Sequence, residues 1–161
     1  MKKTSNTGIG KDTIKSIEGI LNLYLYDKNN QLLQEQSEHN LIVMLGYHTV
    51  AKALAGVPNS HIIKIAIGTN GSSEQESDMT ISNPLFFNFK KIEYPKQGSV
   101  RFNFEIGYNE AIGMSIREFG LITANDILFS RKTREVIEKT EDFRILGYWD
   151  VVISENGASS I

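Results

Sequence analysis

The residues of this chain that could do chemistry are not gathered into a known catalytic motif. The segment Gly8-Ile9-Gly10-Lys11-Asp12-Thr13 has glycines and a lysine like those of a phosphate-binding loop, in which the lysine and the following hydroxyl must reach phosphate and magnesium. However, Asp12 stands where serine or threonine is required, Ser5 stands where the first glycine should be, and no expected strand precedes the segment. We therefore interpret it as part of a flexible arm.

Metal-ligating residues are equally sparse. His39, His48 and His61 have no partner at metal-ligand spacing nearby, and a zinc site needs three or four converging ligands. The chain has no cysteine, which removes disulfides, thiolate zinc sites and cysteine nucleophiles. We expect no metal and no cofactor, and stability that comes from packing.

Enzymatic catalysis has little support in the sequence. No Gly-x-Ser-x-Gly elbow is present, and acidic residues are scattered as on any soluble surface. A glycosidase would need two carboxylates about 5 to 10 Å apart across a cleft, a distance that the sequence does not give. We predict a non-enzymatic protein, and a hydrolase with an acidic pair stays open as an alternative. The carboxylates concerned are Glu105, Glu110, Glu118, Asp142 and Asp150.

Charge and hydropathy argue against nucleic acid and membrane partners. The chain has 17 Lys plus Arg against 19 Asp plus Glu, so its net charge of -2 gives no general attraction to phosphate groups. The basic run Arg131-Lys132-Thr133-Arg134 is typical of a solvated sheet edge protected by charge. No 18 consecutive residues are apolar, so we expect no membrane insertion. Met1-Lys2-Lys3 is not followed by an apolar run, so we expect no signal peptide.

The elements that must position these residues begin after a polar arm. Residues 1–15 carry only Ile9 and Ile14 as bulky apolar side chains, too few to bury a core, so we place the domain at 16–161. From residue 20 the apolar residues Leu21, Leu23 and Leu25 alternate with polar and aromatic ones, which is the period of a strand. The segment 27–30 reads as a turn, since Asp and Asn bond to nearby backbone.

One helix is expected, over residues 43–55. Its apolar residues recur every three to four positions, which is the spacing of one face of a helix. Gly56 and Pro58 follow in the order that ends helices. The stripe consists of Val43, Tyr47, Val50, Ala51 and Leu54.

The rest of the chain reads as strands separated by turns. A polar loop at 68–80 interrupts them, and loops of this length tend to be functional or mobile, so we regard it as a candidate contact site. About eight or nine strands with one short helix predict a mainly β fold, an antiparallel β-sandwich or distorted barrel. Strands are expected at 63–67, 85–94, 100–106, 114–122, 127–133, near 136 and at 143–153.

Aromatic residues indicate two kinds of surface. Tyr24 and Tyr26 lie on the strand face opposite Leu21, Leu23 and Leu25. We therefore expect both faces of this strand to be covered, the second one by another sheet or by a neighbouring subunit. Alternatively, exposed aromatic rings or the 68–80 loop would make the chain a carbohydrate-binding module, with surface glycans as ligands. The aromatic candidates are Tyr24, Tyr26, Tyr94, Tyr108 and Trp149.

Three short segments stand out in the order of elements over residues 38–153: Ala66-Ile67-Gly68-Thr69 before a Ser-rich acidic loop, Glu118-Phe119-Gly120-Leu121, and Leu128-Phe129-Ser130-Arg131. This order of segments resembles that of small tail-fibre-associated and baseplate-associated proteins of tailed bacteriophages. It implies a structural protein of the virion tail, made in the host cytoplasm and assembling with other tail proteins, as a homo-oligomer. A long fibre shaft is missing, which favours an adaptor, collar, baseplate or decoration role. In this scheme the arm orders on binding and places Ile9 and Ile14 in a partner's groove.

Overall fold

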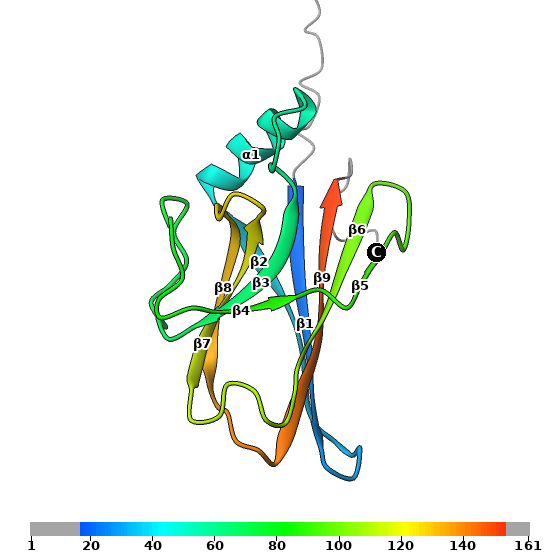
Figure 1. Ribbon diagram of the computed structural model, residues 1–161, viewed down its shortest axis with the longest axis vertical. Coiled ribbons are helices and arrows are strands. Elements are labelled where there is room, and N and C mark those ends of the chain that lie inside the picture. The colour runs from blue at the N-terminus through cyan, green and yellow to red at the C-terminus, as the bar shows by residue number, and fades with distance from the viewer. Residues whose placement is uncertain (1–16, 154–161) are drawn as a thin grey trace, which may run out of the picture.

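A computed structural model describes residues 17–153, which form one curled antiparallel sheet of nine strands, a half-barrel, with a helix at one end (Figure 1). This confirms the prediction of a mainly β antiparallel fold with one short helix. The elements are β1 (Ile17–Asp27), β2 (Leu32–Ile42), α1 (Met44–Leu54), β3 (Ile62–Gly68), β4 (Leu85–Asn88), β5 (Lys91–Glu93), β6 (Ser99–Ile106), β7 (Ser115–Thr123), β8 (Leu128–Glu138) and β9 (Phe143–Ile153).

The strand order β4-β3-β7-β8-β2-β1-β9-β6-β5 explains the curl. Strands β2 and β8 pair only at Leu41 with Arg131 and at Ile42 with Ser130, so the sheet bends sharply between its two halves. The terminal strands β4 and β5 are consecutive in the chain, with only Phe89 and Lys90 between them. Because this short link joins the two ends of the strand order, the sheet must wrap around one core. The sequence predicted a single strand at 85–94, which the structure divides into β4 and β5.

The core fills the inside of the curl, where inward-facing residues of β1, β3, β6, β7, β8 and β9 meet. Strand β2 contributes only Ile42 to it. Leu21, Leu23 and Leu25 are buried there, as their alternation predicted. Each such side chain contributes about 1.5 to 3 kcal/mol when fully buried. Gly147 of β9 faces inward against the ring of Phe104, and a Cβ at this position would overlap with that ring. Because Gly147 has no side chain, the ring of Phe104 can pack directly against the backbone of β9.

The predicted turn after β1 is confirmed. The side-chain oxygen Oδ1 of Asp27 accepts hydrogen bonds from the backbone N–H groups of Asn29 and Gln31, at 2.8 and 2.9 Å. Asn30 adopts a φ of 61°, a left-handed conformation that asparagine tolerates. This turn sets the register of the β1–β2 hairpin.

The predicted helix is confirmed, but most of its apolar stripe does not face the core. Gly46 and Thr49 are the buried residues of α1, and a Cβ at Gly46 would overlap with the backbone oxygen of Phe129 on β8. The helix backbone thus rests directly on the sheet. Tyr47 is 48% exposed and Leu54 85% exposed, so most of the stripe points away from the core. No helix in the described residues is long and apolar enough to cross a membrane.

Candidate functional site

The sequence-predicted partner residues Tyr24 and Tyr26 both lie on the outer face of the sheet, while Ile9 and Ile14 fall outside the described residues. Both tyrosines are half-buried. The side chains next to them, Arg101, Arg144 and Tyr148, lie on the same face. We call this surface the tyrosine face. It comprises Tyr24, Tyr26, Arg101, Arg144 and Tyr148.

At the centre of the tyrosine face, Tyr24 and Tyr148 stack with ring centroids 6.1 Å apart. Their hydroxyl oxygens lie 3.4 Å apart. This hydrogen bond, together with burial, raises the pKa of Tyr24 to about 12. The guanidinium of Arg101 lies 3.9 Å from the Tyr148 ring centroid and donates two hydrogen bonds, of 2.7 and 2.8 Å, to the carboxylate of Asp150. The face is therefore a connected layer of polar and aromatic groups.

The other three aromatic candidates occupy places that the sequence did not distinguish. Trp149 is completely buried in the core, so the expectation that it could serve as an exposed platform for sugars is wrong. Its neighbours on β9 face outward because successive residues of a strand alternate. Tyr108 is half-buried and its hydroxyl donates a hydrogen bond of 2.7 Å to the backbone oxygen of Asp27. Tyr94, after β5, is 78% exposed.

The sequence predicted that the basic run of β8 is a solvated sheet edge, and this prediction is wrong. Arg131 is 1% exposed in the interior of the sheet, and its guanidinium contacts the equally buried carboxylate of Glu118 on β7 at 2.8 Å. Burial disfavours the charged guanidinium, but the hydrogen bonds that it donates to Glu118 and Asp78 outweigh this effect and raise the pKa of Arg131. The sequence could not reveal this pair because the two residues meet only through strand pairing.

This buried pair holds the 68–80 loop. Arg131 donates to the carboxylate of Asp78 at 2.8 Å and to the backbone oxygen of Asn70 at 3.0 Å. Glu118 accepts the backbone N–H groups of Asn70 and Ser82 at 3.0 and 2.8 Å. The loop that the sequence marked as a contact candidate is thus fixed to the sheet by a charged anchor at both of its ends.

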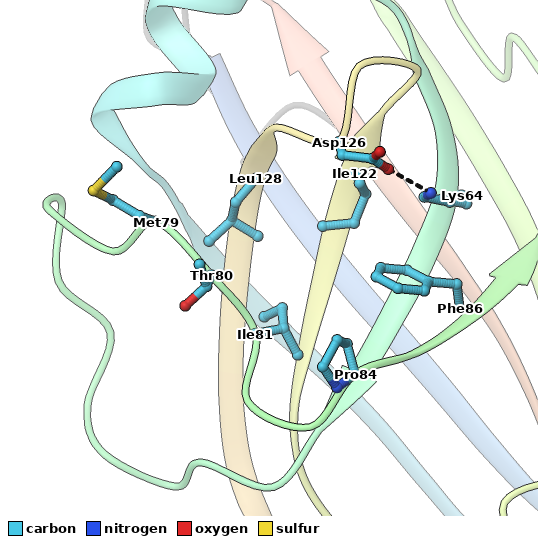
Figure 2. A pocket seen from close by; sticks show the side chains of 9 residues that line it. All are labelled: Lys64, Met79, Thr80, Ile81, Pro84, Phe86, Ile122, Asp126 and Leu128. Carbon is cyan, nitrogen blue, oxygen red and sulfur yellow. Dashed lines mark hydrogen bonds and ion pairs between the residues drawn. The ribbon is translucent and has the colours of Figure 1, made fainter.

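Figure 2 shows an apolar groove beside this loop, which we call the loop groove. It has a volume of about 430 Å³. Its floor consists of buried Ile81, Ile122 and Leu128, and at one end Lys64 and Asp126 form an ion pair of 2.6 Å. The ammonium of Lys64 also lies 4.5 Å from the ring centroid of Phe86. The groove is therefore an apolar surface, and the two opposite charges at its rim neutralise each other.

Several exposed side chains of α1 are apolar and share one side of the helix. We call Met44, Tyr47, Ala51 and Leu54 the helix seam. Their spacings of three, four and three residues match the pattern by which helices contact one another. Met44 is 63% exposed and Leu54 85% exposed. Part of the apolar stripe that the sequence predicted for this helix is therefore an outward-facing surface.

A second groove, which we call the helix groove, runs between α1 and the adjacent ends of β1, β3 and β9. Its volume is about 210 Å³. Its walls are almost entirely apolar, and it is continuous with the helix seam through Leu54. The lining includes Ile17, Val50, Ala53, Leu54, Ile62 and Ile153.

The carboxylates that the sequence raised as possible acid pairs each have a structural partner. The three histidines do not converge, and no group of three His, Cys, Asp or Glu residues within 17–153 could hold a metal ion. The partners are Arg131 for Glu118, Arg101 for Asp150, Arg144 for Glu105, the backbone N–H of Gly107 for Glu110, and the hydroxyl of Thr140 for Asp142.

Comparison of the chain with family models, curated proteins and solved structures found no match.

Proposed function

We propose that this chain is a non-enzymatic structural protein that works by assembling with other proteins, as a fibre, adaptor or baseplate component of a phage-like tail. The observation that carries the assembly role is the helix seam. Large apolar side chains cost free energy when they face water, at about 25 cal/mol per Å² of apolar surface. Contiguous exposed apolar surface is typical of contact sites.

The buried charges support the same proposal. Arg131, Glu118 and Asp78 are used to anchor the long loop, so this part of the surface has a defined shape. A surface of fixed shape pays less ordering entropy on association, which favours repeated contacts in an assembly. The tail assignment itself comes from the resemblance of residues 38–153 to tail-associated proteins.

The assembly role is tested by measuring the native mass of the wild-type protein and of the double variant Tyr47→Ser, Leu54→Ser. We expect the wild-type protein to form a defined oligomer, or to bind a tail protein encoded nearby, and the variant to lose that contact with its melting temperature unchanged. The matched control is Tyr94→Ser, Ile112→Ser, because these residues are 78% and 53% exposed elsewhere on the surface. Equal assembly by the seam variant and the control would contradict the role of the seam.

The second candidate is a carbohydrate-binding module, and the tyrosine face is the observation that favours it. Shallow depressions of about 330 and 200 Å³ lie on either side of Tyr24, and polar side chains such as Asn103 and Glu35 line them. Ring faces beside hydrogen-bonding groups suit sugars. Binding to a glycan array that disappears in Tyr24→Ala and Tyr148→Ala, but persists in Tyr94→Ala, would favour this function over assembly alone.

A further inference from the structure

We propose that the loop groove binds a small amphipathic carboxylate, of the size and kind of a medium-chain fatty acid. The carboxylate of this ligand lies at the ammonium of Lys64, and its aliphatic tail lies over Ile81, Ile122 and Leu128, which all line the groove. None of these residues belongs to the helix seam, so the inference goes beyond the proposed assembly function and does not depend on it.

The two ends of the loop groove differ in chemistry. Figure 2 shows Lys64 and Phe86 at one end and Met79 at the other, with the apolar floor between them. The volume of about 430 Å³ falls in the range of roughly 300 to 1,000 Å³ that is typical of small-molecule sites. A ligand with one polar head and an apolar body fits this arrangement.

The wall of the groove is preformed, because the sheet holds the loop that builds it. Gly120 of β7 has no side chain, and a Cβ there would lie only 2.8 Å from a side-chain carbon of Ile81, so Ile81 packs directly on the strand. The next residue, Ser82, donates its backbone N–H to the carboxylate of Glu118 at 2.8 Å and accepts the backbone N–H of Thr69 at 3.1 Å. A ligand therefore meets a groove of fixed shape, and little ordering entropy is lost on binding.

The ammonium of Lys64 indicates that the polar head is an anion. An ammonium has three N–H donors, and within residues 17–153 the only hydrogen bond of this one goes to Asp126, at 2.6 Å. Its contact with the Phe86 ring, at 4.5 Å from the centroid, supplies no acceptor oxygen. The Lys64 side chain is only 20% exposed, so water has restricted access to the remaining donors. A ligand carboxylate satisfies them with charge-assisted hydrogen bonds.

The exposure of the two charges argues against a cationic head. Asp126 is 74% exposed at the turn between β7 and β8, so water solvates its carboxylate, whereas Lys64 is mostly withdrawn from water between that carboxylate and the Phe86 ring. An ion pair with one partner in water is weak, so a ligand carboxylate can share the ammonium with Asp126. A cationic head in the groove would be repelled by Lys64.

The chemical class of the ligand is tested by NMR titration of the full-length protein with octanoate, octanol and octyltrimethylammonium. We expect saturable binding of octanoate, weaker binding of octanol and the weakest binding of the cation. Between hexanoate, octanoate and decanoate the affinity should rise about fourfold for each added CH₂, as expected when the tail is buried. Failure of octanoate and decanoate to saturate would overturn the site, and tighter binding of the cation would overturn the anionic head.

The titration also locates the ligand. We expect octanoate to shift the methyl signals of Ile81 and Leu128 and to leave those of Val50 and Ile153, which line the helix groove, unchanged. Shifts confined to the helix groove would overturn the assignment of the ligand to the loop groove.

Lys64→Met tests the position of the carboxylate, because methionine keeps an apolar stem and removes the charge. We expect octanoate to bind at least about tenfold more weakly and octanol to bind as it does to the wild type, since only a hydrogen bond to a charged group is lost. Lys52→Met is the matched control, because Lys52 is an exposed lysine on α1, and it should change neither affinity. Octanoate that binds Lys64→Met as tightly as it binds the control would overturn the role of Lys64.

Asp126→Asn provides a change in the opposite direction. Asparagine tolerates the left-handed φ of 64° at this position, and the substitution removes the carboxylate that competes for Lys64. We expect octanoate to bind about two- to fivefold more tightly than to the wild type. Weaker binding of octanoate to Asp126→Asn, with an unchanged melting temperature, would show that the head does not share the ammonium with Asp126 and would overturn this placement.

Discussion

Arg131 and Glu118 lie on the adjacent strands β8 and β7, and their Nε and Oε2 atoms are 2.8 Å apart. Neither side chain is more than 1% exposed. A buried ion pair contributes little net stability by itself, but removing one partner leaves an uncompensated charge in the interior. Here the same two side chains also hold the backbone of Asn70 and Ser82, so the pair links core stability to loop position.

Replacing Arg131 by methionine is expected to destabilise the protein by about 3 to 5 kcal/mol, because Glu118 is left buried without its cation. Urea unfolding followed by circular dichroism measures the change. Arg117→Met is the control, since Arg117 is exposed on the same strand as Glu118 and its loss should change stability by no more than about 0.5 kcal/mol. Equal effects of the two substitutions would contradict the role assigned to the pair.

Glu74 makes the attachment of the loop sensitive to acid. Burial alone would raise the pKa of this carboxyl, but the backbone N–H of Thr133, at 2.7 Å, and the nearby Lys132 lower it below its ordinary value of 4.5. The stabilisation is therefore complete above pH 4.5 and is lost as the pH falls through the lower folded-state value. Glu74→Gln should lower the free energy of unfolding at pH 7 by about 0.2 to 1 kcal/mol. Its difference from wild type should disappear towards pH 2, and a constant difference would contradict this account.

Tyr24 should ionise only near pH 12, because its hydroxyl shares a hydrogen bond with Tyr148 and is partly withdrawn from water. Its contribution to stability is present below pH 10, the ordinary value, and is lost as the pH rises towards 12. Tyr148→Phe should bring the pKa of Tyr24 closer to 10. Titration of the tyrosine signals by NMR measures the shift, and an unaltered Tyr24 titration in the variant would show that the shared hydrogen bond is not its cause.

Gly46→Ala should displace α1 from the sheet, because the added Cβ would overlap with the backbone oxygen of Phe129. We expect a loss of about 1 to 3 kcal/mol, the usual range for forcing extra atoms into a packed interior. Thermal unfolding measures it. Gly71→Ala is the matched control, since a Cβ there would meet only the side chain of Arg117, at 3.4 Å. A neutral Gly46→Ala would mean that the helix can shift without cost.

The sequence alone determined the elements whose patterns are local. Leu21, Leu23 and Leu25 alternate with polar residues, and a strand follows because successive side chains point to opposite faces. Asp27 bonds to its own turn, and Gly56 ends the helix. These features depend on residues only a few positions apart, so they could be predicted from the sequence.

The tertiary structure alone decided which side of each element meets the core. Part of the apolar stripe of α1 resembles a buried face, but Gly46 brings the helix backbone against β8 and turns Tyr47 and Leu54 outward. Arg131 belongs to a basic run typical of a solvated edge, yet strand pairing places it beside Glu118. Both outcomes depend on contacts between residues far apart in sequence. Periodicity reports that a residue has a preferred face, but only the packing of distant strands determines what that face meets.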